Sequence, residues 1–236
     1  MAVFRDRSDA GRALAAALMH HAGHAGHAGH AGHADDEVMV LALPRGGVPV
    51  AFEVAVRLAA PLDVFLVRKL GVPGHEELAM GAIASGGVEV VNEQLIARLG
   101  ISRRALEAAI TRERRELQRR ELAYRGGRAP LEVAGRTVIL IDDGLATGST
   151  MKAAVAGLRK LGPGRIVVAV PVAAPESCAE IGAEVDEIVC LATPTPFHGV
   201  GLWYEQFPQV DDAEVHALLA ASARPSPRPA AGHALV

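Results

Sequence analysis

Short apolar runs alternate along this chain with longer helical segments, and this alternation constrains the fold more than any other feature. The runs are aliphatic at nearly every position, as in VMVLAL at 38–43 and TVILI at 137–141. Strands of that kind are buried on both faces, which is typical of a parallel sheet covered by helices on both sides. The sequence therefore predicts an α/β fold built on a parallel sheet.

The same alternation predicts where the strands and helices lie and where a ligand binds. Strands are expected at 38–43, 62–67, 88–92, 137–141, 165–170 and 185–192. Helices are expected at 8–19, 48–60, 102–125, 148–161, 175–183 and 211–221. Ligands of such sheets bind beyond the carboxyl ends of the strands. The site is therefore expected in the loops after residues 43, 67, 141, 170 and 192.

Composition narrows the class of protein. The 236 residues are 50% apolar and carry a net charge of −3, so we expect a buried core and no nucleic-acid binding driven by a global basic field. No apolar run reaches the roughly 18 residues of a membrane span, and the first residues lack the pattern of a signal peptide. Two cysteines, Cys178 and Cys190, are too few for a disulfide scaffold, which favours a reducing cytoplasm.

Residues 20–33, HHAGHAGHAGHAGH, form a repeat of period three that carries six of the ten histidines. Glycine at every third position disfavours a helix, so a flexible surface insertion is expected. One interpretation is a weak metal-binding tract, since imidazole is a common metal ligand. The favoured alternative is a low-complexity expansion without a selected role.

The segment 102–125 is predicted to be a helix that is capped by Ser102 and stopped by Gly126-Gly127. It carries eight arginines and four glutamates. A solvated or subunit-facing helix with ion pairs between residues i and i+4 is the favoured interpretation. A nucleic-acid face is the alternative, although the segment has no interleaved aromatic stripe to support it.

The strongest motif is VILIDDGLATGST at 138–150, where a buried strand runs into Asp142 and Asp143. Small and hydroxyl-bearing residues follow before a helix begins: Gly144, Ala146, Thr147, Gly148, Ser149 and Thr150. Free amides and hydroxyls at a helix N-terminus suit phosphate. Carboxylates repel phosphate and suit sugar hydroxyls, or a magnesium ion bound through water. The motif predicts a ribose 5-phosphate site, and a plain acidic turn with capping hydroxyls is the alternative.

This stretch resembles the phosphoribosyl pyrophosphate (PRPP) motif of the type I phosphoribosyltransferases. The resemblance implies that Asp142 and Asp143 are the catalytic acids that contact the ribose hydroxyls, and that residues 146–150 bind the 5-phosphate. The likeness extends from about Phe4 to Leu219 and implies a Rossmann-like core with a small hood. The implied domain covers 1–222, with the insertion at 20–33, a mobile loop at 71–87, a hood segment at 193–210, and a disordered tail at 223–236.

Two further places are implied to bind pyrophosphate. Arg45-Gly46-Gly47 follows the first core strand, where the family has its pyrophosphate loop and often a strained cis peptide, here expected between Arg45 and Gly46. Arg68-Lys69 follows the second strand, near the family's basic contacts to pyrophosphate. The alternatives are a plain turn for the first and surface charge for the second.

Two segments are implied to close the site. The glycine-rich stretch 71–87 corresponds to the family's mobile catalytic loop, with His75, Glu76 and Glu77 as its polar candidates. The hood segment holds four of the eight aromatic residues of the chain: Phe197, Trp203, Tyr204 and Phe207. Phe197, Trp203 and Tyr204 are the candidates for binding a flat base. A purely structural cap is the alternative.

The resemblance implies glycosyl transfer from PRPP with Mg²⁺ as cofactor, release of pyrophosphate, and a nitrogen acceptor such as a nucleobase. A PRPP- or nucleotide-sensing module without turnover and a phosphoribosyl hydrolase are the alternatives. The family further implies a homodimer. The cysteine count, the apolar runs and the net charge predict a cytoplasmic protein with no membrane or nucleic-acid partner. The PRGGVPVA, RKLGVP and WYEQF segments are similar to those of bacterial stand-alone phosphoribosyltransferase-domain proteins whose acceptor is generally not established.

Overall fold

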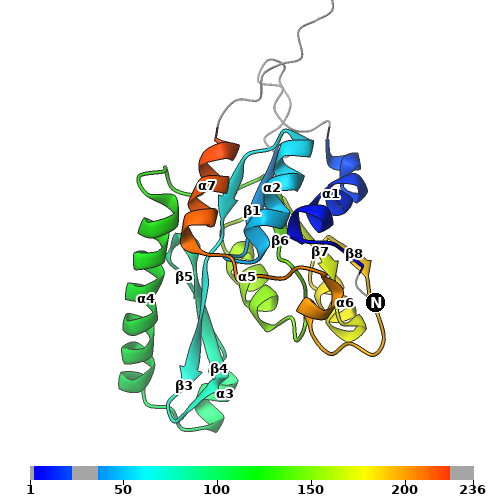
Figure 1. The fold of residues 1–236 in the computed structure, drawn as a ribbon. Coiled ribbons are helices and arrows are strands. Elements are labelled where there is room, and N and C mark those ends of the chain that lie inside the picture. Colours follow the sequence, from blue (N-terminus) through cyan, green and yellow to red (C-terminus); the bar gives the residue numbers. More distant parts are fainter. Residues whose placement is uncertain (1–2, 23–36, 224–236) are drawn as a thin grey trace, which may run out of the picture.

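The computed structural model describes residues 3–22 and 37–223 (Figure 1). Its centre is a five-stranded sheet in the order β2-β1-β6-β7-β8, in which every neighbouring pair is parallel. The strands are β1 (Val38–Ala42), β2 (Leu62–Val64), β6 (Thr137–Ile141), β7 (Arg165–Val172) and β8 (Glu187–Ala192). The parallel sheet predicted from the aliphatic runs is confirmed.

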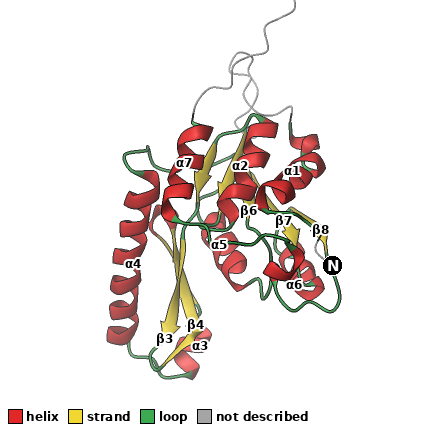
Figure 2. Cartoon of the chain, viewed as in Figure 1, coloured by secondary structure: helices red, strands yellow, loops and turns green. Residues whose placement is uncertain are grey.

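Helices cover both faces of this sheet, as the aliphatic strands require (Figure 2). One face is covered by α1 (Arg7–Ala17), α2 (Gly47–Leu58) and α7 (Asp212–Ser222), and the other by α5 (Ser149–Arg159) and α6 (Pro175–Gly182). Consecutive strand residues enter different cores: Val40 packs with the first group of helices and Leu41 with the second. None of the described helices is both long and apolar enough to cross a membrane.

A second sheet projects from the first, and the sequence does not predict it as a separate sheet. It is antiparallel, in the order β3-β4-β5, with β3 (Val67–Val72), β4 (His75–Ala84) and β5 (Val88–Val91). Two short helices, η3 (Ser85–Gly87) and α3 (Glu93–Arg98), flank β5. The strand expected at 62–67 is therefore two strands in different sheets, and Arg68 and Lys69 lie within β3 rather than after a core strand.

The expectation of a loop at 71–87 is wrong for this structure, because most of that segment forms the β3–β4 hairpin. Two of its glycines, Gly71 and Gly81, lie at close approaches of the backbone. A Cβ on Gly71 would lie 2.7 Å from the Glu76 carbonyl oxygen, and one on Gly81 would overlap the backbone of β5. The ladder is also irregular around Gly71, where two register shifts occur. Glycine inside a strand often marks such a bulge or close approach.

The long helix α4 (Arg103–Arg125) lies against this second sheet (Figure 1). Ser102 caps it by accepting from the Ala105 amide, and Gly126 ends it with a positive φ, both as predicted. Helix α5 contacts the second sheet as well as packing on the parallel one, so it lies between the two sheets. The second sheet is thereby fixed beside the turn at which α5 begins.

The ends of the chain differ in detail from the expectations. Asp6 caps α1, so the helix begins one residue before the expected start at residue 8. The insertion expected at 20–33 begins later, because His20 and His21 belong to a short 3-10 helix, η1 (Met19–His21), and His21 is buried. The remainder of the repeat and the expected tail from 224 onward lie outside the described residues.

Cys178 of α6 and Cys190 of β8 form a disulfide, with Cα atoms 6.8 Å apart. The sequence does not predict this pairing, because two cysteines in a chain of this length are more typical of free thiols. The bond links the edge strand β8 to the helix that covers it.

Candidate active site

The two acids lie where the parallel sheet predicts a ligand. Asp142 and Asp143 follow the last residue of β6, the central strand of the five. Both are half-buried, and the Asp143 amide donates to Asp142 Oδ1 at 2.9 Å. This turn holds two adjacent carboxylates at the carboxyl end of the sheet, in line with the general rule for such folds.

Arg7 of α1 binds one of these acids. Its Nε donates to Asp143 Oδ2 at 2.9 Å, and its Nη2 lies 2.8 Å from the same oxygen. The guanidinium also lies over the Phe207 ring, 3.7 Å from its centroid, and donates to the Pro208 carbonyl. Arg7 therefore joins the first helix, the acid pair and the segment that follows the last strand.

The pKa values of the two acids are shifted upward. Burial raises the pKa of Asp142 well above its ordinary value, and the neighbouring charge of Asp143 raises it further. Burial also raises the pKa of Asp143, while the Arg7 guanidinium opposes that rise. Perturbed carboxylates in an open turn are a mark of functional sites. Asp142, which lacks an arginine partner among the described residues, is the acid better placed to meet a ligand cation or hydroxyl.

The turn after β1 presses directly on the acid pair. A Cβ on Gly46 would lie 2.6 Å from Asp143 Cγ, and one on Gly47 would lie 3.0 Å from Asp142 Cα. Only glycine permits this approach. A non-proline cis peptide is present here, but between Pro44 and Arg45 rather than between Arg45 and Gly46 as expected. The Arg45 side chain is partly exposed, with Nη1 3.6 Å from Asp212 Oδ1.

The turn from Gly144 to Thr150 has the form of an anion cradle. Gly148 caps α5 with a φ of 66°, and Ala146, Thr147, Ser149 and Thr150 are exposed. Hydrogen bonds anchor the turn: the Leu145 amide donates to the Val172 carbonyl, the Ala174 amide donates to the Leu145 carbonyl, and Ser177 Oγ donates to the Ala146 carbonyl. The first amides of an α-helix have no partner within the helix and attract anions. The hydroxyls and amides of this turn can therefore hold a phosphate.

Lys69 reaches this cradle from the second sheet. Its Nζ donates to Ser149 Oγ at 2.7 Å, and its side chain is exposed. The structure thus places Lys69, which was expected to bind pyrophosphate, beside the residues expected to bind the 5-phosphate. A cation beside a phosphate-binding turn adds a charged donor to the anion site.

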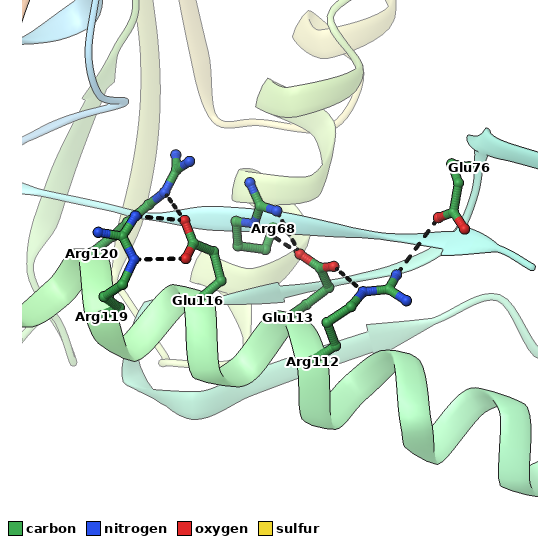
Figure 3. A network of polar contacts seen from close by, with 7 residues as sticks. All are labelled: Arg68, Glu76, Arg112, Glu113, Glu116, Arg119 and Arg120. Atoms are coloured by element: carbon green, nitrogen blue, oxygen red, sulfur yellow. Dashed lines mark hydrogen bonds and ion pairs between the residues drawn. The ribbon is translucent and has the colours of Figure 1, made fainter.

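Arg68 precedes Lys69 on β3, and its side chain binds α4 instead of the cradle (Figure 3). Its guanidinium donates to Glu113 Oε2 at 2.7 and 2.9 Å, and Glu113 also accepts from Arg112, which contacts Glu76. The arginines lower the pKa of Glu113 against the opposing effect of burial. Arg68 still lines a cavity of about 350 Å³ together with Lys69 and Thr150. The main role of Arg68 is structural, because its ion pair with Glu113 links β3 to α4.

The aromatic residues expected to bind a base form a cap beside the acids. Phe197 and Trp203 are stacked with centroids 6.4 Å apart. Tyr204 is buried, packs on Phe4 and Phe207, and donates from its hydroxyl to the Asp143 carbonyl at 2.6 Å. Tyr204 therefore positions the acid pair, while Phe197 and Trp203 are half-buried.

The hood segment is seated on the acid turn through a glycine. A Cβ on Gly144 would lie 2.6 Å from Val200 Cγ1, in η4 (Val200–Trp203). This close approach places the hood over the same end of the sheet as the acids and the cradle. The structure thus brings together the acids, both loops, Lys69 and the hood, whereas Arg68 is drawn toward α4.

Sequence reasoning missed Arg7. The contact joins residues 136 positions apart, and nothing in the local pattern RDRSDA distinguishes Arg7 from its neighbour Arg5. Arg5 is exposed and pairs with Asp6, whereas Arg7 is only 9% exposed. The one available signal is the buried face of α1, on which Arg7 lies with Leu14.

The match to known proteins decides the family. The family model of the phosphoribosyl transferase domain matches residues 25–204. This chain belongs to the phosphoribosyl transferase family. The resemblance stated from VILIDDGLATGST and the type I phosphoribosyltransferase fold are thereby confirmed.

Phosphoribosyl transferase relatives cover most of the chain. A Mycobacterium tuberculosis protein provisionally named a phosphoribosyl transferase is 45% identical over 219 residues, or 93% of this chain. The match covers 47% of that protein, so this chain spans about half the length of the curated relative. A crystal structure from Thermus thermophilus superposes with a TM-score of 0.80 and 42% identity, covering 95% of this chain and all of that one. The bifunctional protein PyrR of Chloroflexus aurantiacus is 34% identical over 53% of this chain and 65% of its own length.

Proposed function

We propose that this chain transfers the ribose 5-phosphate of PRPP to a nitrogen nucleophile, with a nucleobase as the acceptor class, and releases pyrophosphate. One observation carries the proposal: two adjacent acids and an exposed anion cradle follow one strand, and Lys69 reaches the cradle from a second sheet. A phosphate-binding turn beside two carboxylates that can accept hydrogen bonds from hydroxyls matches the two ends of a ribose 5-phosphate.

The cradle is the proposed anchor of the 5-phosphate. Thr147, Ser149 and Thr150 offer hydroxyls, the start of α5 offers amides, and Lys69 offers a charge within hydrogen-bond distance of Ser149. Binding of the non-reacting phosphate fixes the sugar relative to the acids. Such positioning contributes to the rate because it removes the entropic cost of alignment from the reaction step.

The acids are the proposed holders of the ribose hydroxyls. Asp142 keeps Oδ2 free of protein partners among the described residues, and Asp143 keeps Oδ1 free because Arg7 engages Oδ2. As the bond to pyrophosphate lengthens, positive charge develops on the ribose, and these fixed carboxylates stabilise it electrostatically.

Arg45 and the backbone of Gly46 and Gly47 are the proposed contacts of the leaving pyrophosphate. The Arg45 ion pair with Asp212 is long and exposed, so the guanidinium can turn to a diphosphate at little cost. The donor set fits a magnesium ion in part, since each acid keeps one free oxygen but the charge of Asp143 is paired with Arg7. We propose that Asp142 holds Mg²⁺ through water. When bound, that ion would neutralise diphosphate charge.

Phe197 and Trp203 are the proposed contacts of the acceptor base. They stack on each other in the hood, next to the turn that carries the acids. Aromatic faces suit flat bases without selecting one of them. We assign Tyr204 a positioning role only, because its hydroxyl donates to the Asp143 carbonyl.

A product assay tests this proposal. The protein is incubated with PRPP, MgCl₂ and a panel of purine and pyrimidine bases, and pyrophosphate and nucleotide are measured, with Asp142→Asn as the inactive control. Pyrophosphate release that requires one base class, with equimolar nucleotide, supports transfer. Release without a base would make the protein a hydrolase, and PRPP binding without turnover would make it a sensor. Either result would overturn the transferase proposal.

A further inference from the structure

A second group of ligand-type side chains lies at the other end of the parallel sheet. Glu187 is the first residue of the edge strand β8, whereas the acid pair follows the last residue of the parallel strand β6. His20 and His21 reach Glu187 from η1, which follows α1. His20 Nε2 lies 2.8 Å from Glu187 Oε1, and His21 Nε2 lies 3.3 Å from Glu187 Oε2. This cluster has no part in the reaction proposed above.

His20 contacts a backbone carbonyl through Nδ1 and the Glu187 carboxylate through Nε2. Its Nδ1 lies 3.1 Å from the Ala17 carbonyl oxygen, which can only accept, so Nδ1 carries a proton. In a neutral ring, Nε2 then directs a lone pair at Glu187 Oε1. A proton or a metal ion between the two atoms removes that repulsion. A ring nitrogen that ligates a metal while the other donates to a backbone carbonyl is the usual arrangement of metal-bound histidine.

His21 provides a second, independent sign of a missing partner. Its side chain is only 8% exposed, and Nε2 is buried without a hydrogen bond in the described structure. Glu187 Oε2, 3.3 Å away, forms no hydrogen bond with this nitrogen, and a buried polar atom without a hydrogen bond is costly. Arg165 also binds Glu187 Oε2, at 2.8 Å, which holds the carboxylate in place.

We propose that His20, His21 and Glu187 form a zinc site. The ligand atoms of the three residues all lie within 4.8 Å of one another. Tetrahedral ligands at about 2.0–2.1 Å from zinc are roughly 3.4 Å apart, so small side-chain shifts complete the geometry. Two imidazoles and one carboxylate suit zinc or a similar transition ion and not magnesium, which prefers oxygen ligands. The fourth position is open to water or another ligand.

The site has a structural consequence. Zinc held by His20, His21 and Glu187 would clamp the end of α1, through η1, to the edge strand β8. A ligand that binds only the folded state stabilises it according to its concentration and affinity. We therefore expect zinc to raise the melting temperature of this chain independently of PRPP.

The repeat must be separated from this site in any test, because four more histidines follow within the next twelve residues. The parent protein is therefore made without a polyhistidine tag and with asparagine in place of the repeat histidines His24, His27, His30 and His33. Zinc binding to the metal-free parent is measured by calorimetry and chelator competition, and thermal unfolding is followed with and without ZnCl₂. Zinc-edge X-ray absorption reports the ligand types.

Three single substitutions in this parent decide the matter. His20→Asn changes an exposed side chain and Glu187→Gln keeps the shape of the carboxylate, so both should fold. His75→Asn, an exposed histidine of the β3–β4 hairpin, is the matched control. We expect one zinc per parent chain, an affinity at least 100-fold lower after His20→Asn or Glu187→Gln, and no change after His75→Asn. A parent that binds no zinc, or equal affinity in all four proteins, would overturn the site and leave the transferase proposal untouched.

Discussion

Arg7 Nε donates to Asp143 Oδ2 at 2.9 Å and thereby ties the first helix to the acid turn at the centre of the sheet. The arginine is 9% exposed and lies over the Phe207 ring, so the pair is shielded from water. Removal of one partner from a shielded pair leaves an uncompensated charge, which typically destabilises more than the pair itself stabilises.

Arg7→Met is therefore expected to lower the free energy of unfolding by about 3 kcal/mol, measured by urea denaturation. Arg7→Lys should lose less, because it keeps the charge but not the planar fork or the stacking on Phe207. Arg12→Met on the same helix is the control: its pairs with Asp9 and Glu53 are exposed, so its loss should stay within about 0.5 kcal/mol. Equal losses for Arg7→Met and Arg12→Met would contradict the buried role.

Asp142→Asn is expected to stabilise the protein at neutral pH while it disables the site. The pKa of Asp142 is raised in the folded state, so between its ordinary value near 3.8 and its folded value the folded protein binds more protons than the unfolded chain. Wild-type stability therefore falls as pH rises through that range, and asparagine avoids the loss. The gain of Asp142→Asn in unfolding free energy should be close to zero near pH 3.5 and should grow as the pH rises above the ordinary pKa of the carboxyl. A gain that shrinks with rising pH would show that the carboxyl is not disfavoured by burial.

Gly46→Ala tests the close approach of the β1 turn to the acids. The added methyl would lie 2.6 Å from Asp143 Cγ, so the acid or the turn must move. We expect a loss of about 2 kcal/mol in stability and loss of PRPP binding. Gly127→Ala introduces the same methyl where nothing lies within 4 Å and should change neither quantity. Wild-type PRPP affinity in Gly46→Ala would show that the turn has no part in the site.

Substitutions of Lys69 and Arg68 should have different effects, because Lys69 contacts the ligand site and Arg68 stabilises the fold. Lys69→Met is expected to weaken PRPP binding about tenfold with little change in stability, because the lysine is exposed and touches the cradle at Ser149. Arg68→Met should instead destabilise the protein, because it leaves the buried Glu113 with fewer partners. Lys160→Met, an exposed lysine at the end of α5, is the control for the removal of a charge. The reverse pattern would assign pyrophosphate binding to Arg68.

The parallel sheet could be predicted from the sequence because its signal is local: Val138 to Ile141 are buried on both faces and form one aliphatic run. The acid turn could be predicted for the same reason, since the acids, small residues and hydroxyls are contiguous. The hairpin at 67–84 was missed because glycines that allow close strand contact look the same in a sequence as glycines that allow mobility.

Contacts between distant segments could not be predicted at all. Arg7 meets Asp143, Lys69 meets Ser149, and His21 meets Glu187 only because the fold brings their elements together. No periodicity or spacing marks such a pair in one chain. The cis peptide was expected in the correct loop but one bond too late, which is the usual precision of a local pattern.

Calorimetric titration of PRPP with MgCl₂ into the wild-type protein and into the double variant Asp142→Asn/Asp143→Asn tests the central claim most directly. We predict saturable binding at one site per chain for the wild type, and an affinity at least 100-fold lower for the double variant, which circular dichroism should show to be folded. Equal affinity in the two proteins, or no binding by the wild type, would contradict the assignment of this turn as the PRPP site.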